Sequence, residues 1–282
     1  MNAVLMITTL LCLTLQSVLR KNYSKKVDGK GVYTYTTLAG VGTLAFFLLT
    51  AKDLHFNLEI LPYSIWFAVS YILAGVAGLK AIAVGSLSLT SLVTNCALIL
   101  PTLYGLIFLK EPADLFLYSG MALLVAALVL VNKSGEKSPI TGKWMLWAML
   151  SFLGNGMCSV SQKVQQDAFA GAGKNELMIF ALVIVIAVNA VLAITAEKRE
   201  IRTCIKNGWS SGLIAGAANG VVNLFVMIMV GRMPASMVFP LITGGSIVLT
   251  HFVSKIFYKE QLSKRQTLGF LLGVASIIFL NL

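Results

Sequence analysis

Ten apolar stretches, separated by short polar connections, run along the chain. They cover residues 2–19, 32–51, 64–84, 86–109, 114–131, 143–162, 176–196, 209–230, 234–258 and 267–282. A helix that crosses the roughly 30 Å hydrocarbon core of a bilayer needs about 20 residues, and most of these stretches are close to that length. The pattern therefore predicts an all-α integral membrane protein with ten transmembrane helices.

The second half of the chain repeats the first. Residues 86–132 align with residues 235–281 without a gap, so that Thr94 corresponds to Thr243. The polar linker at residues 133–142 separates two predicted five-helix repeats, residues 1–132 and 143–282. Because each repeat has an odd number of spans, the second copy inserts into the membrane inverted relative to the first. Inverted apolar repeats are typical of secondary transporters, whose substrate site lies between the repeats near the bilayer midplane.

Composition and charge agree with a membrane location. The chain is 57% hydrophobic and 12% charged, whereas soluble domains are about 25% charged. The net charge of +11 does not indicate a nucleic-acid partner, because the basic residues lie in short loops. Sixteen Lys and Arg residues lie in or beside the loops after odd-numbered helices, and five lie at the even-numbered ones. Since cytoplasmic loops carry the positive excess, we expect the 133–142 linker in the cytoplasm and both termini outside the cell.

A phenylalanine and acid pattern ends the fourth helix of each repeat. It reads Phe108-Leu-Lys-Glu111 and Phe257-Tyr-Lys-Glu260, and a glycine follows each about nine residues later. With the two repeats, this pattern resembles the EamA-like transporters, the ten-helix branch of the drug/metabolite transporter superfamily. The resemblance covers essentially the whole chain. It implies a transporter with one central cavity between the two repeats, surrounded by helices one to four and six to nine, with helices five and ten behind. It implies no particular substrate. Family members are commonly drawn with cytoplasmic termini, which conflicts with the loop charges here.

Ionisable groups at membrane depth are few. All acidic residues fall in loops or at helix ends, and we interpret Glu111 and Glu260 as helix-end charges. A proton-coupled site needs a group that gains and loses charge, and His251 is the deep side chain that can titrate near neutral pH. It is a candidate for proton coupling, with a hydrogen bond to a neighbouring helix as the alternative. Lys80 either extends its ammonium to the interface or anchors a carboxylate or phosphate at a cytoplasmic mouth.

Uncharged polar residues are more numerous at depth. Interhelical hydrogen bonds of about 0.6 kcal/mol would explain any one of them, whereas together they favour a polar cavity. Asn219 and Asn223, four residues apart, share a helix face. A stripe of small residues, Gly212, Gly216 and Gly220, instead favours close helix packing. The candidate substrate-binding residues are Tyr71, Lys80, Ser91, Thr94, Asn95, Asn155, Asn219, Asn223 and Thr243.

Signals for other functions are absent from the sequence. It has no GxSxG, HExxH or phosphate-loop motif, and its four cysteines form no CxxC pair. We therefore expect no enzyme activity, no cofactor and no metal. The favoured interpretation is a monomeric or homodimeric secondary transporter that moves a small polar or amphipathic metabolite across the cell membrane by alternating access. Two alternatives stay open, a receptor or assembly subunit that does not transport, and a flippase for lipids or lipid carriers.

Overall fold

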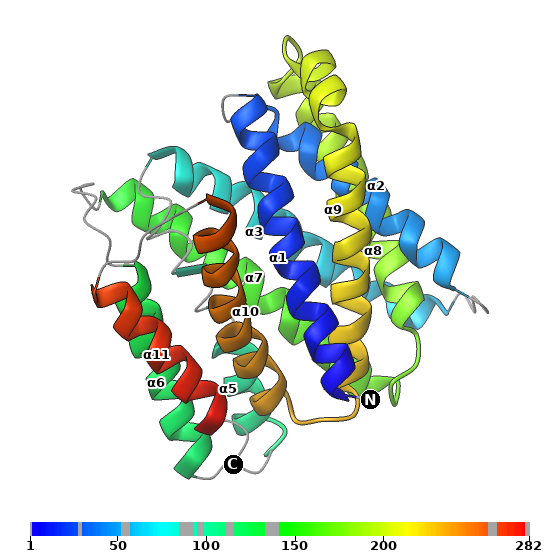
Figure 1. Ribbon diagram of the computed structural model, residues 1–282. Helices are drawn as coiled ribbons and strands as arrows, with labels where there is room; N and C mark the ends of the chain where they lie inside the picture. Colours follow the sequence, from blue (N-terminus) through cyan, green and yellow to red (C-terminus); the bar gives the residue numbers. More distant parts are fainter. Residues whose placement is uncertain are drawn as a thin grey trace. The chain divides into compact units, whose positions relative to one another are not determined.

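The computed structural model of the protein is helical throughout its described residues, which are 2–27, 30–51, 57–84, 93–94, 97, 99–110, 115–132, 141–258 and 264–279. Each predicted apolar stretch overlaps one α-helix (Figure 1). The helices are α1 (Asn2–Lys26), α2 (Val32–Thr50), α3 (Leu61–Val84), α5 (Ile99–Ile107), α6 (Leu115–Asn132), α7 (Gly142–Ala168), α8 (Lys174–Ala196), α9 (Ile201–Val230), α10 (Ala235–Tyr258) and α11 (Lys264–Phe279), with a 3-10 turn (Leu58–Ile60) before α3. The predicted all-α class is confirmed.

Several helices are long and apolar enough to cross a bilayer. Within the described part of the chain these segments are Ala3–Arg20, Val32–Thr50, Leu58–Gly78, Lys174–Ala196 and Ile201–Val230. Their outer faces carry large apolar side chains such as Leu11 and Val191, which are 55% and 60% exposed. Such a surface is unfavourable in water and favourable against lipid tails. The helices α1, α7 and α9 continue beyond the predicted apolar stretches because polar residues extend them at one end.

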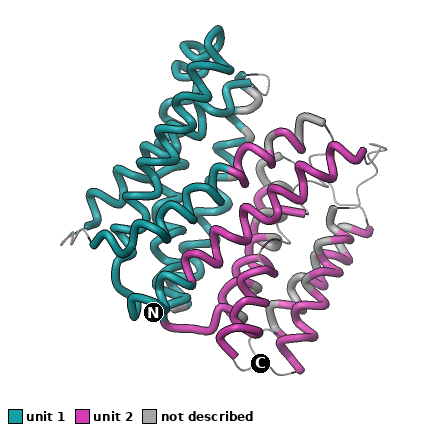
Figure 2. The backbone as a smooth tube through the Cα atoms, turned by 180° about the vertical axis from the view of Figure 1, so that it is seen from behind, with its two compact units in different colours: residues 1–72, 164–231 teal, residues 73–163, 232–282 magenta. Residues whose placement is uncertain are grey.

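The chain forms two compact units, which Figure 2 shows in different colours. Unit 1 comprises residues 1–72 and 164–231, and unit 2 comprises residues 73–163 and 232–282. Each unit takes helices from both predicted repeats. Within unit 2, α6 packs on α11 and α5 packs on α10, and within unit 1 α2 packs on α8. Helices that hold equivalent positions in the two predicted repeats therefore lie side by side.

Close backbone approach joins α2 to α9 within unit 1. A Cβ atom added at Gly216 would lie 2.1 Å from the Ala39 carbonyl oxygen, and one at Gly42 would lie 2.3 Å from the Leu213 carbonyl oxygen. The Thr43 hydroxyl donates a 2.8 Å hydrogen bond to the Gly216 carbonyl. Small residues permit this approach, as they do at helix interfaces in membranes. The packing role predicted for the glycine stripe is confirmed.

A carboxylate from the second half of the chain caps the start of α2. Gly31 precedes the helix with φ 67° and offers no side-chain cap. Glu197, in the turn after α8, accepts hydrogen bonds from the backbone nitrogens of Tyr33 at 2.7 Å and Thr34 at 2.9 Å. These are donors that a helix start leaves without an intrahelical partner. The negative charge also suits the positive end of the helix dipole.

Candidate functional site

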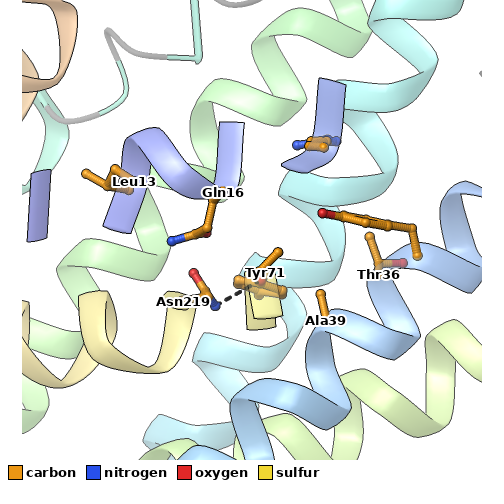
Figure 3. Close-up of a pocket in the computed structure, with 9 residues that line it drawn as sticks. Leu13, Gln16, Thr36, Ala39, Tyr71 and Asn219 are labelled. Carbon is orange, nitrogen blue, oxygen red and sulfur yellow. Dashed lines mark hydrogen bonds between the residues drawn. The ribbon is translucent and has the colours of Figure 1, made fainter. Parts of the chain in front are cut away.

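A cavity of about 210 Å³ lies within unit 1, between α1, α2, α3 and α9 (Figure 3). Helical spacing explains how these elements meet around it, because residues three or four apart share one face of a helix. Gln16 and Arg20 on α1 have this spacing, as do Ala215 and Asn219 on α9. The cavity is lined by Leu13, Gln16, Arg20, Tyr35, Thr36, Ala39, Tyr71, Ala215 and Asn219.

Two polar atoms of the cavity wall are buried without a hydrogen-bond partner. They are the side-chain nitrogen of Gln16 and the hydroxyl of Tyr35, a residue that is only 7% exposed. Buried polar atoms nearly always have a partner, and one left unpaired costs about 1–3 kcal/mol. Both atoms belong to residues that line the cavity.

Asn219 and Tyr71 form a second polar group in the same cavity. The Asn219 side-chain nitrogen donates to the Tyr71 hydroxyl at 3.4 Å, a long and weak hydrogen bond. Figure 3 shows Gln16, Asn219 and Tyr71 turned toward the same space. The Tyr71 ring stacks on Phe67 of its own helix, with centroids 5.7 Å apart. The structure thus brings together two of the residues that the sequence proposed for substrate binding.

The wall that α1 contributes to the cavity carries a positive charge. Arg20 is the charged member of the lining, and none of the lining residues is acidic. Arg20 ends the first apolar span. A guanidinium presents five N–H donors and no acceptor. Together with Gln16 and Tyr35, it makes this wall rich in hydrogen-bond donors.

Tyr35 is held in place by Tyr23, which lies near the end of α1. The two rings stack with centroids 4.6 Å apart, and the Tyr23 hydroxyl donates to the Gly31 carbonyl at 2.8 Å. Burial, with a smaller contribution from a hydrogen bond to Cys204, raises the pKa of Tyr23 above its ordinary value. The ring stack and the hydrogen bond to Gly31 together hold Tyr23 against Tyr35 at the cavity wall.

Other predicted site residues gather in unit 2. The hydroxyls of Thr94 and Ser151 lie 3.4 Å apart, and the Asn155 side-chain nitrogen donates to the Ser151 carbonyl at 2.8 Å. The Lys80 ammonium lies 4.4 Å from the ring centroid of Trp147, which is within cation–π range. Thr94, Asn155 and Lys80 thus have polar or aromatic partners in this unit.

Two predicted site residues bond to their own helices. Asn223 donates to the Asn219 carbonyl at 2.9 Å, and Thr243 donates to the Phe239 carbonyl at 3.0 Å. Neither lines the unit 1 cavity. Several further residues named from the sequence lie outside the described residues, namely Ser91, Asn95, Glu111, Glu260 and the side chain of His251.

Sequence reasoning overlooked seven of the nine lining residues, and four of these, Gln16, Arg20, Tyr35 and Thr36, are polar. In the sequence, Arg20 begins the basic cluster that follows the first apolar stretch, although its i, i+4 spacing from Gln16 places both on one helix face. This spacing could have indicated the site, because an Arg one turn after a Gln in an apolar helix continues the same polar face. Nothing in the sequence around Tyr35 distinguishes it from an aromatic residue at the membrane interface.

In the described part of the chain, no group of three or more His, Cys, Asp or Glu residues could hold a metal ion. The cavity has the features of a small-molecule site, with apolar walls and a few convergent polar groups.

Comparisons with known proteins identify the family. A search of curated proteins gives no match. A solved structure titled "Crystal structure of protein" superposes with a TM-score of 0.79 at 13% sequence identity, over 99% of this chain and 95% of that chain. At this identity the match shows a shared fold. The profile of the EamA-like transporter family matches residues 142–282, which are half of the chain. The resemblance seen in the sequence is confirmed, and the chain belongs to the EamA-like transporter family of membrane transporters.

Proposed function

We propose that this protein is a secondary transporter that moves a small polar or amphipathic metabolite across the cell membrane by alternating access. One observation carries the proposal: the unit 1 cavity holds two buried polar atoms, on Gln16 and Tyr35, that lack a partner. The chain belongs to a family of membrane transporters, and a transporter needs a cavity that binds its substrate. The atoms without partners indicate that the cavity is built for a ligand.

The size and lining of the cavity support a small substrate. Its volume of about 210 Å³ is below the range of about 300–1,000 Å³ that is typical of sites for drug-sized ligands. Apolar side chains of Leu13 and Ala215 face it together with the polar side chains of Gln16 and Asn219. A short carbon skeleton with polar substituents suits this mixture.

The packing of equivalent helices supports the proposed arrangement of ten spans in two inverted repeats. An inverted repeat relates its two copies by a pseudo-twofold axis, so equivalent helices are expected to meet. The pairs α5 with α10, α6 with α11 and α2 with α8 do so within their units. We retain residues 1–132 and 143–282 as the repeats on this basis.

The cavity's position along the helices agrees with a stage of alternating access. The lining residues Tyr35 and Ala39 lie three and seven residues after the start of the Val32–Thr50 span. At about 1.5 Å per residue, they are about 5–11 Å along the helix axis from that end of the span. The cavity therefore lies on the side of the α1 to α2 connection. Loop charge assigns this connection to the cytoplasm, and we propose that the structure represents a state whose site lies nearer the cytoplasmic side.

Transport in proteoliposomes tests the function. Purified protein should take up a metabolite that raises its melting temperature, and Gln16→Leu and Tyr35→Phe should reduce uptake. Tyr118→Phe is the matched control, because Tyr118 is 55% exposed in unit 2. Ligand binding without uptake would contradict the proposal and favour a receptor. Movement of labelled lipid without metabolite uptake would favour a flippase.

The coupling mechanism is tested in the same vesicles. The cavity lining holds no carboxylate, so we propose uniport, exchange, or proton coupling through His251. Glu111→Gln and Glu260→Gln should behave like the wild type. A pH gradient should therefore drive uptake by all three proteins or by none of them. If the gradient drives the wild type and His251→Gln but fails in a glutamate variant, the helix-end role of these acids is wrong.

A further inference from the structure

We propose that the unit 1 cavity binds an oxyanion, the carboxylate or phosphate group of its substrate, through Arg20, Tyr35 and Gln16. The proposal rests on the proposed function in taking this cavity as the substrate site. It names the chemical class of the ligand, which neither the fold nor the family supplies.

The hydrogen-bonding capacity of the wall points to an acceptor. The Gln16 side-chain nitrogen can only donate, and it is buried without a partner. The Arg20 guanidinium also only donates. The buried Tyr35 hydroxyl, which is likewise without a partner, can donate its proton to the same group. A ligand group with several lone pairs satisfies all three side chains at once, and carboxylate and phosphate oxygens provide them.

The charge of the wall points to an anion. Among the lining residues, Arg20 is cationic and none is acidic, and no ion pair joins Arg20 to an acidic residue of the described part of the chain. A carboxylate nearby, that of Glu197, already accepts three hydrogen bonds from Tyr33 and Thr34 at the start of α2. A cationic ligand would be repelled by Arg20, whereas an oxyanion would pair with it bidentately.

The placement of the donors sets the orientation of the ligand. Gln16 and Arg20 lie one turn apart on α1, and Tyr35 faces the same cavity from α2. The exposed Arg20 side chain stands at the end of the membrane span, where a charged group can enter from water. The oxyanion then occupies the end of the cavity nearest the α1 to α2 connection. The apolar residues Leu13, Ala39 and Ala215 are left for the carbon skeleton.

Matched ligands test the proposal on the full-length protein in detergent. The probes are butyrate with its uncharged isostere butyramide, glycerol 3-phosphate with glycerol, and butylamine. We expect at least one oxyanion to raise the melting temperature while the uncharged partners and the amine do not. The comparison of butyrate with butyramide tests for a carboxylate ligand, and that of glycerol 3-phosphate with glycerol tests for a free phosphate ester. Nanodiscs with and without phosphatidic acid test whether the oxyanion is the headgroup of a lipid.

Variants connect the effect to the named residues. Arg20→Gln should weaken oxyanion binding by about 10- to 100-fold, the effect of losing hydrogen bonds to a charged group, and Tyr35→Phe by about 10-fold. Arg202→Gln and Tyr118→Phe change exposed residues outside the cavity and should bind as the wild type does. Arg20→Lys should bind oxyanions better than Arg20→Gln, because it retains the charge. If Arg20→Gln does not fold, the proposal is tested by whether the wild type binds the oxyanions and not their uncharged partners or the amine.

The results separate this proposal from the proposed function. Equal binding of butyramide or butylamine, unchanged oxyanion binding by Arg20→Gln, or no shift with any oxyanion overturns the oxyanion site. Transport of an uncharged or cationic compound that depends on Gln16 would overturn it too, while leaving the transporter proposal intact. Oxyanion binding that depends on Arg20, without any flux, supports the site and contradicts the transporter proposal.

Discussion

The carboxylate of Glu197 accepts two hydrogen bonds from Thr34, one from its backbone nitrogen at 2.9 Å and one from its hydroxyl at 2.8 Å. The two residues lie 163 positions apart in the chain. Thr34 directly precedes Tyr35 and Thr36, which line the cavity. A turn in the second half of the chain therefore fixes the start of a cavity helix from the first half.

Replacing this cap should destabilise the protein. Glu197→Ala leaves the buried donors of Thr34 and the part-buried backbone donor of Tyr33 without an acceptor, at a cost of about 1–3 kcal/mol in the free energy of unfolding. Glu200→Ala is the control, because its ion pair with Lys30 spans 3.2 Å between exposed side chains and such pairs contribute about 0–1 kcal/mol. Denaturation followed by circular dichroism measures both. Equal losses in the two variants would contradict the capping role.

Gly31→Ala should also destabilise the protein. Gly31 has φ 67°, and an added Cβ atom would lie 2.2 Å from the Cys204 sulfur and 2.5 Å from the Tyr23 hydroxyl. Backbone strain of this kind alone costs about 1–3 kcal/mol. At Gly75, in α3, an added Cβ atom meets nothing within 4 Å. Gly75→Ala should therefore leave the melting temperature unchanged or raise it, and a comparable fall in both variants would refute the explanation.

Gly216→Ala should push α9 away from α2 and disturb the cavity. The new methyl group would meet the carbonyl of Ala39, which is itself a lining residue. We expect a lower melting temperature together with weaker ligand binding. Ala217→Leu, at the exposed neighbouring position on α9, should change neither. If Gly216→Ala bound ligand like the wild type, the close packing would not shape the site.

Asn219→Ala should reduce ligand binding and hardly affect folding. Its hydrogen bond to Tyr71 is 3.4 Å long, and interhelical bonds in membranes average about 0.6 kcal/mol. Asn223→Ala is the comparison, because Asn223 donates to its own helix and does not line the cavity. Isothermal titration should show the larger loss of affinity for Asn219→Ala. The reverse order would indicate that the site lies elsewhere.

Cysteine labelling tests the orientation predicted from loop charge. In a variant without the native Cys12, Cys96, Cys158 and Cys204, Lys52→Cys should react with an impermeant reagent in intact cells. Ser138→Cys, in the linker predicted between the two repeats, should react only after the cells are opened. Both positions lie outside the described residues. The opposite result would place both termini in the cytoplasm, as is commonly drawn for the family.

The fold could be predicted largely from the sequence because membrane helices are specified locally, by stretches of apolar residues. The division into units could not, because it depends on contacts between distant helices such as α2 and α8. The same limit applies to the candidate site. Asn219 and Tyr71 were recognisable as polar groups at depth, whereas Arg20 at a helix end looked like a loop charge. The role proposed for Arg20 depends on Tyr35, which lines the same cavity from another helix.

Unit 1 combines helices from both halves of the chain, and this determines when its cavity can form during translation. The cavity takes α1, α2 and α3 from the first half of the chain and α9 from the second, and Tyr71 and Asn219 are 148 residues apart. Ribosomes add about 5–20 residues per second, so roughly 7–30 s separate the two residues during translation. Throughout that interval the polar side chains of α1 and α2 are already in the membrane without their final neighbours. The proposed site is therefore complete only late in translation, once α9 has been inserted.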